Sequence, residues 1–189
     1  MHPVEVLLIP LGKAFRNRRA DETASISRAS ELATDTHFEL RSPSFNDGEE
    51  IPAKHCSVFI GDDISPGLTW GVLPDGTADL VLLMEDIDSP GAMPRIHALA
   101  AFAPTGDGLP EGALTPDTPG MRFAPGRRGP RKYAGPRPLP GHGPHRYRFH
   151  LYALDSRVDL AAVTEPALLP SALEGHVLAS GTLMGSRTT

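Results

Sequence analysis

Acidic, imidazole and phenolic side chains stand at the ends of three apolar segments of this sequence. Asp86 and Asp88 close the run that begins at Asp79, and His97 opens a second run. His145 and Tyr147 open a third. Two carboxylates, two imidazoles and a phenol are groups that hydrogen-bond a polar ligand or exchange protons with one.

Strand geometry decides whether these groups can meet. Side chains two residues apart share one face of a strand, which pairs Asp86 with Asp88 and His145 with Tyr147. We therefore hypothesise that the strand ends converge on one pocket. Simpler roles stay open for each residue alone: either aspartate could cap the turn before Pro90, the histidines could be surface or core residues, and Tyr147 could be a core aromatic.

Metal binding and nucleophilic catalysis find less support. His142, His145 and His150 lie close in sequence, and Asp86 or Asp88 could complete a metal site. However, a regular strand puts His150 on the face opposite His145, and His142 lies in a Gly/Pro loop. The chain has no Gly-x-Ser-x-Gly elbow, Cys–His signature or phosphate-binding Gly-rich loop. We therefore predict no metal, no cofactor and no enzymatic activity.

A basic segment between the second and third apolar runs could contact nucleic acid. Only Phe123 and Tyr133 interleave with its charges, and the whole chain has a net charge of −5, so a solvated loop is favoured over nucleic-acid binding. The segment could still attract an anionic ligand or an acidic protein partner. Its basic residues are Arg122, Arg127, Arg128, Arg131, Lys132 and Arg137.

Composition predicts one domain with many short strands. The 189 residues are 40% hydrophobic and include 20 Pro and 19 Gly, which favour frequent turns. The single cysteine, Cys56, excludes a disulfide within the chain. The N-terminus lacks the pattern of a signal peptide, and no apolar run approaches the length that spans a bilayer. We therefore expect a cytoplasmic protein without membrane insertion.

The elements that must position these groups follow from the apolar runs. The continuous run 79–88 predicts a strand covered on both faces, and 97–102 and 146–154 predict two more. The Gly/Pro-rich stretch 104–144 is long enough to be a functional or disordered loop. A capping box at Ser171 and Glu174 predicts a helix that stops near Gly181, before a last strand at 181–185. Residues 4–9 could form a strand or half of an amphipathic segment.

Four stretches resemble one family in order along the chain. Residues 133–154 resemble the signature of bacterial phosphatidylethanolamine-binding proteins, also called Raf-kinase-inhibitor-like proteins. Ile64-Ser-Pro-Gly-Leu-Thr-Trp70 is similar to an early family segment, and Glu85-Asp-Ile-Asp-Ser-Pro90 to its Asp-Pro-Asp-x-Pro motif. Residues 174–185 resemble its closing helix and strand. The resemblance covers residues 38–185.

This resemblance implies an all-β fold with one or two short helices: a Greek-key β-sandwich of two antiparallel sheets over residues 38–189. Residues 1–37 would be an extension that packs on the domain edge. A homodimer is also implied. The expected ligand is a small anion: phosphate, a carboxylate or a phosphoethanolamine head group. Its binding residues would be Asp86, Asp88, Pro90, His97, Pro138, Gly143, His145 and Tyr147.

Two departures from the family pattern bear on ligand choice. Ile87 replaces the proline between the two aspartates, and Ala98 replaces the tryptophan after His97. The leading hypothesis is a non-enzymatic, regulatory binding protein for a small anion or phospholipid head group. The alternatives are a kinase or protease inhibitor acting through surface loops, and a metal-dependent or hydrolytic enzyme on the same scaffold.

Overall fold

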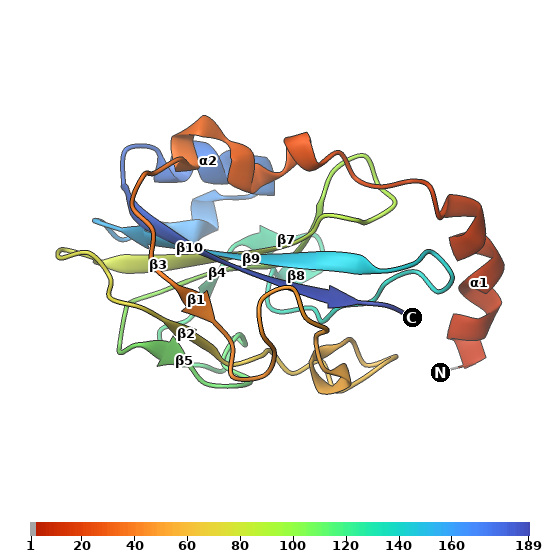
Figure 1. The fold of residues 1–189 in the computed structure, drawn as a ribbon. Coiled ribbons are helices and arrows are strands. Elements are labelled where there is room, and N and C mark those ends of the chain that lie inside the picture. The colour runs from red at the N-terminus through yellow and green to blue at the C-terminus, as the bar shows by residue number, and fades with distance from the viewer. Residues whose placement is uncertain (1–2) are drawn as a thin grey trace.

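The computed structural model describes residues 3–189 as two antiparallel β-sheets that pack against each other (Figure 1). The larger sheet consists, in spatial order, of β10 (Val177–Arg187), β9 (His145–Leu154), β3 (Asp79–Asp86), β4 (Arg95–Phe102) and β6 (Arg122–Phe123). The smaller consists of β1 (Leu40–Arg41), β2 (Leu68–Trp70) and β5 (Gly108–Leu109). The predicted all-β fold of two antiparallel sheets is confirmed.

The central strand β3 is apolar along its whole length because both of its faces are covered. All eight of its residues are buried. Alternate side chains of a strand point to opposite faces, so Leu80 and Leu82 enter the cluster between the sheets. Val81 and Leu83 enter a second cluster on the outer face. This double coverage is what the continuous apolar run predicts.

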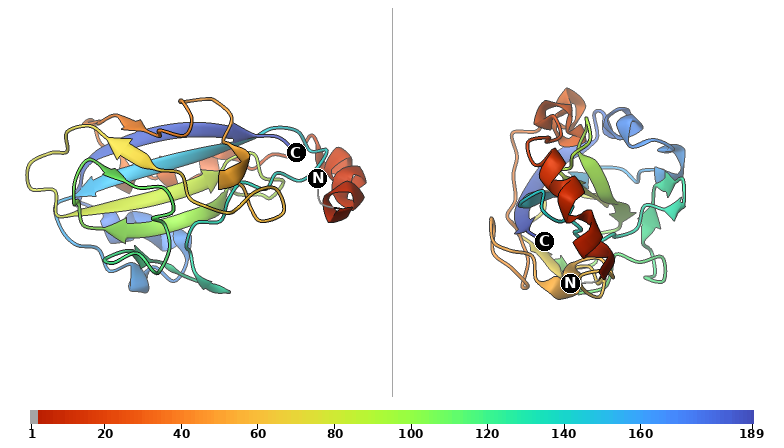
Figure 2. Two further views of the ribbon diagram at one scale, coloured as in Figure 1. Left: turned by 90° about the horizontal axis from the view of Figure 1, so that it is seen from below. Right: turned by 90° about the vertical axis from the view of Figure 1, so that its right-hand side faces the viewer.

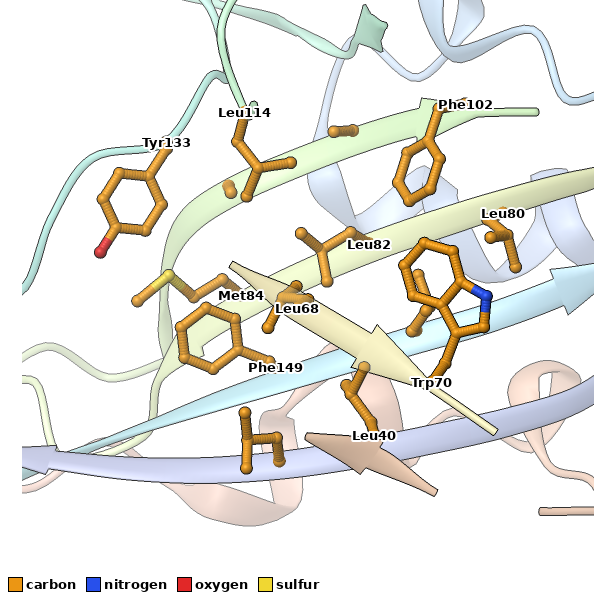
Figure 3. Close-up of a cluster of buried hydrophobic side chains, with 14 of the residues drawn as sticks. Leu40, Leu68, Trp70, Leu80, Leu82, Met84, Phe102, Leu114, Tyr133 and Phe149 are labelled. Atoms are coloured by element: carbon orange, nitrogen blue, oxygen red, sulfur yellow. The ribbon is translucent and has the colours of Figure 1, made fainter. Parts of the chain in front are cut away.

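The main hydrophobic core fills the space between the two sheets (Figure 3). Leu40 of β1 and Trp70 of β2 point from the small sheet toward Leu82, Phe102 and Phe149 of the large one. The Trp70 and Phe102 rings pack with their centroids 5.9 Å apart. Burial of this aromatic and aliphatic surface is the dominant force that holds the sheets together.

The outer face of the large sheet is covered by helix α2 (Leu169–Leu173) and by short 3₁₀ turns (Figure 1). The predicted bounds of this helix are wrong. Ser171 lies inside α2, Glu174 follows its last residue, and Val177 already begins β10. Gly175 has a φ of +78°, the left-handed conformation that commonly ends a helix, and the residues beyond it pair with β9 instead.

The N-terminal segment forms helix α1 (Pro3–Phe15), which lies across one end of the sandwich (Figure 2). The stretch 4–9, for which the sequence allows a strand or half of an amphipathic segment, is the first part of this helix. Further along, the amide of Asp21 donates to the carbonyl of Ala92. The Ser25 hydroxyl donates to buried Glu85 at 2.6 Å. The segment before the sheets is thus attached to the domain by buried contacts.

The long stretch 104–144 is built from short ordered pieces. It contributes β5 and β6 to the two sheets and forms a separate hairpin of β7 (Pro125–Gly126) and β8 (Gly129–Pro130). The remainder is partly buried, with Leu114 and Tyr133 in the main core, and it ends in the loop that leads into β9 at His145. Within residues 3–189, no helix has the length and apolar character needed to cross a bilayer.

Candidate functional site

The antiparallel register of the large sheet brings three strand ends together. Asp86, the last residue of β3, pairs with Arg95 of β4 on one side and with Tyr147 of β9 on the other. His97 follows Arg95 by two residues, and His145 precedes Tyr147 by two. The hypothesis that acids, histidines and a tyrosine converge at one end therefore agrees with the strand pairing.

A cavity of about 270 Å³ opens at this end of the sheet. Five of the eight predicted binding residues line it: Asp86, Pro90, His97, Pro138 and His145. Six further residues complete its wall: Leu8, Ser89, Arg95, Arg137, Leu139 and Pro140. The wall thus combines one carboxylate with two imidazoles and two guanidinium groups.

A buried hydrogen-bond chain fixes the orientation of His145. Its Nδ1 lies 2.8 Å from Oδ2 of Asp86, and its Nε2 lies 2.7 Å from Nδ1 of His142. The Nε2 of His142 lies 2.8 Å from the carbonyl of Arg18, which can only accept, so this nitrogen carries the proton. Burial lowers the pKa of His142, so its ring is neutral and its Nδ1 accepts.

His145 is held between two partners. Its Nδ1 contacts the Asp86 carboxylate, and its Nε2 contacts Nδ1 of His142, which also lies 2.7 Å from Nη1 of Arg19. The side chains of His145 and Asp86 are both buried. Asp86 also accepts the backbone amide of Asp88 at 3.0 Å. The Asp86 carboxylate therefore has two hydrogen-bonding neighbours inside the protein.

His97 and Tyr147 carry buried polar atoms that lack a partner among residues 3–189. The His97 Nδ1 donates to the carbonyl of Ala134 at 2.6 Å, which leaves its Nε2 without a hydrogen bond. The Tyr147 hydroxyl is likewise unpaired, and the two rings meet edge to face at 5.2 Å. Unpaired buried polar atoms are rare and commonly mark a place where a ligand or water binds.

Burial determines the charge state of both residues. It lowers the pKa of His97, with the Asp86 carboxylate opposing this effect, so the ring is neutral and Nε2 is a hydrogen-bond acceptor. Burial raises the pKa of Tyr147, and the Asp86 charge adds to the rise, while the nearby backbone of Arg137 opposes it. The phenol is therefore protonated and can donate. The pair offers one acceptor and one donor.

Three predicted binding residues do not line the cavity. Asp88 points away because β3 ends at Asp86, so the two carboxylates do not share a strand face. It accepts 2.8 Å hydrogen bonds from the backbone and Nε of Arg146. Burial alone would raise the pKa of Asp88, but these hydrogen bonds outweigh it and lower that pKa. Tyr147 lies next to both histidines, with its ring centroid 5.2 Å from that of His97 and 6.4 Å from that of His145, and Gly143 belongs to the adjoining loop at a φ of +107°.

Sequence reasoning missed two arginines and a histidine. Arg95 was detectable, because it shares a strand face with His97 two residues later. Arg137 belongs to the basic segment for which the sequence favours a solvated loop, although the next residue, Pro138, is a predicted binding residue. The sequence places His142 in a Gly/Pro loop, yet its Nδ1 lies 2.7 Å from Nε2 of His145. The contact between His142 and His145 depends on how the loop folds, which the sequence pattern does not show.

The described residues hold no group of three or more His, Cys, Asp or Glu side chains arranged to bind a metal ion. His150, one of the three histidines considered for such a site, lies on the other side of the sheet. Its Nδ1 lies 3.2 Å from the Thr182 hydroxyl, and its Nε2 lies 3.9 Å from Glu85. The three imidazoles therefore do not converge.

A larger cavity of about 450 Å³ lies on the outer face of the large sheet. Most of its wall is apolar, and the buried charge within it is Glu85. Both carboxylate oxygens of Glu85 already accept hydrogen bonds, from Ser25 and from the amide of Ile26. We therefore place the candidate site at the end of the sheet, where the buried His97 Nε2 and Tyr147 hydroxyl remain unpaired.

Two packed antiparallel sheets with a small polar cavity at the strand ends define the class, an all-β sandwich protein. The profile of the family described as "Phosphatidylethanolamine-binding protein" matches residues 41–188. This chain belongs to that family.

Individual relatives agree with this assignment. A UPF0098 protein of Methanothermobacter thermautotrophicus is 34% identical over 150 residues, which cover 77% of this chain and 95% of that protein. The crystal structure of the phosphatidylethanolamine-binding protein homologue CT736 from Chlamydia trachomatis matches with a TM-score of 0.69 and 32% identity, over 82% of this chain and 99% of that chain. YbcL of E. coli, with a TM-score of 0.72, 24% identity and the same coverage of both chains, supports the fold alone.

Proposed function

We propose that this chain is a non-enzymatic binding protein whose end cavity takes a small oxyanion, such as phosphate, a carboxylate or a phosphorylated head group. The observation that carries the proposal is the pair of unpaired buried atoms, the His97 Nε2 and the Tyr147 hydroxyl, beside a cavity lined by Arg95 and Arg137. Guanidinium groups suit phosphate and carboxylate geometry.

The donor–acceptor pattern favours a ligand that is itself both donor and acceptor. In this proposal the Tyr147 hydroxyl, next to His97 but outside the cavity lining, donates to an anionic oxygen that reaches it past His97, whereas the neutral His97 Nε2 needs a proton from the ligand. A hydrogen phosphate or a phosphomonoester with one P–OH group meets both requirements. A carboxylate meets only the first, so we expect phosphate to bind more tightly than acetate.

The fixed state of His145 favours binding over proton transfer. Both of its ring nitrogens are engaged, one by Asp86 and one by His142. A general base needs a free nitrogen within reach of the substrate proton. His145 therefore acts in this proposal as a fixed part of the cavity wall rather than as a general base.

The test is a calorimetric titration of phosphate, acetate and O-phosphorylethanolamine into the native protein and into His145→Ala. We expect saturable binding that is lost in the variant. His176→Ala is the matched control, because His176 forms a similar 2.8 Å contact with Asp155 on the exposed surface, away from the cavity. Absence of binding by the folded native protein, or equal binding by all three proteins, would refute the proposal.

A further inference from the structure

Helix α1 supplies part of the wall of the end cavity, although it lies outside residues 41–188 that match the family. Leu8 of α1 lines the cavity directly. Figure 2 shows the helix lying across the end of the sandwich where β3 ends and β9 begins. The cavity of this chain therefore has an outer wall that the matched domain does not provide.

Glu5 of α1 contacts a cationic residue of the cavity. Its Oε1 accepts hydrogen bonds from Nη2 of Arg137 at 2.7 Å and from Nε at 3.2 Å. Glu5 is only 1% exposed, and its Oε2 has no hydrogen-bond partner within the described part of the chain. A buried carboxylate is costly unless it is paired, so Glu5 and Arg137 are held together.

This contact changes the charge that a ligand encounters. The Asp86 carboxylate is paired with His145, and Arg137 is balanced by Glu5. Among residues 3–189, Arg95 forms no ion pair, which leaves it as the uncompensated cation of the cavity wall. Without Glu5, the wall would carry two uncompensated cations.

We propose that α1 is the specificity element of the end cavity: Leu8 closes the outer wall and limits ligand size, and Glu5 neutralises Arg137 and favours a singly charged anion. This inference rests on the proposed anion-binding function. It assigns to two residues of the N-terminal segment the choice of ligand within that site.

The close packing of α1 provides a way to displace it. Gly12 lies against the loop 138–143, and a Cβ at that position would be 1.9 Å from the carbonyl oxygen of Pro140. No side chain fits at that distance, so Gly12→Ala forces the helix away from the loop. Gly71→Ala is a matched control, because its Cβ would meet the Glu39 amide nitrogen at an ordinary 3.5 Å.

The charge assignment is tested with Glu5→Gln, which keeps the shape of the side chain and removes its charge. Glu111→Gln is the control, since Glu111 pairs with Lys54 on the surface and does not line the cavity. Phosphate and acetate are titrated into each protein near pH 8, where phosphate is mostly a dianion. The electrostatic effect of removing the Glu5 charge scales with the charge of the ligand. If Glu5→Gln increases the affinity for acetate about threefold, it should therefore increase the affinity for phosphate about tenfold.

The size assignment is tested with Leu8→Ala and Gly12→Ala. We expect both to improve the binding of O-phosphorylethanolamine relative to phosphate, whereas Gly71→Ala leaves this ratio unchanged. Tryptophan fluorescence from Trp70 in the core checks that each variant is folded.

The outcomes separate this inference from the proposed function. A phosphate-to-acetate ratio that rises in Glu5→Gln but not in Glu111→Gln supports the charge assignment. Binding by every protein with unchanged ratios overturns the role of α1 and leaves the anion site intact. Absence of binding by the native protein and all variants overturns both.

Discussion

Removal of the Tyr147 hydroxyl should stabilise the protein and weaken its binding of an anion. The ring is fully buried, and the hydroxyl has no hydrogen-bond partner in the described structure. An unpaired buried polar group costs about 1–3 kcal/mol. Tyr147→Phe removes that group and keeps the edge-to-face contact with His97, so we expect the free energy of unfolding to rise by about 1 kcal/mol.

The same substitution should act in the opposite direction on binding. A hydrogen bond from a neutral donor to a charged ligand contributes about 1.5–3 kcal/mol, which corresponds to roughly a 10- to 150-fold loss of phosphate affinity. A rise in stability together with a loss of affinity is the signature of a group kept for a ligand. The loss of a hydroxyl with a purely structural role would not combine a rise in stability with a loss of affinity.

Thermal unfolding and phosphate titration of two variants provide the assay. For a chain of this size, the expected stabilisation of Tyr147→Phe raises the melting temperature by about 2–4 °C. The control is Tyr133→Phe, because the Tyr133 hydroxyl donates to the carbonyl of His55 at 2.6 Å and its loss should lower the melting temperature. If Tyr147→Phe were destabilised like the control and bound phosphate normally, the reasoning would be refuted.

Two further predictions concern buried groups outside the cavity. Burial lowers the pKa of His150 to about 3, so below about pH 6.5 the unfolded chain binds a proton that the folded chain does not, and stability falls as the pH falls. Between pH 7.5 and pH 5, the free energy of unfolding should fall by about 2 kcal/mol less in His150→Gln than in the native protein, as measured by urea titrations. An equal fall in both proteins would contradict the lowered pKa of His150. Burial raises the pKa of Cys56 to about 11, so a thiol reagent at neutral pH should react at the rate of protein opening, and immediate labelling of native protein would contradict this.

The sequence alone determined the sheet and the identity of most groups at its end. The apolar run 79–88 can be buried on both faces only inside a layered structure, and this predicts β3, although the strand ends two residues earlier at Asp86. The two-residue period of a strand predicts that His145 and Tyr147 share one face. Such predictions succeed because the periodicity of an element is local, and a side chain's face depends only on its own strand.

The tertiary structure decided which groups meet across elements. Asp88 shares no face with Asp86 because the strand ends between them, and α2 is short because Gly175 turns the chain into β10. His142 meets His145 only because their loop folds back. Likewise, Glu5 meets Arg137 only because α1 packs across the end of the sheet. These contacts join residues far apart in the chain or held by irregular backbone, and no periodicity in the sequence encodes them.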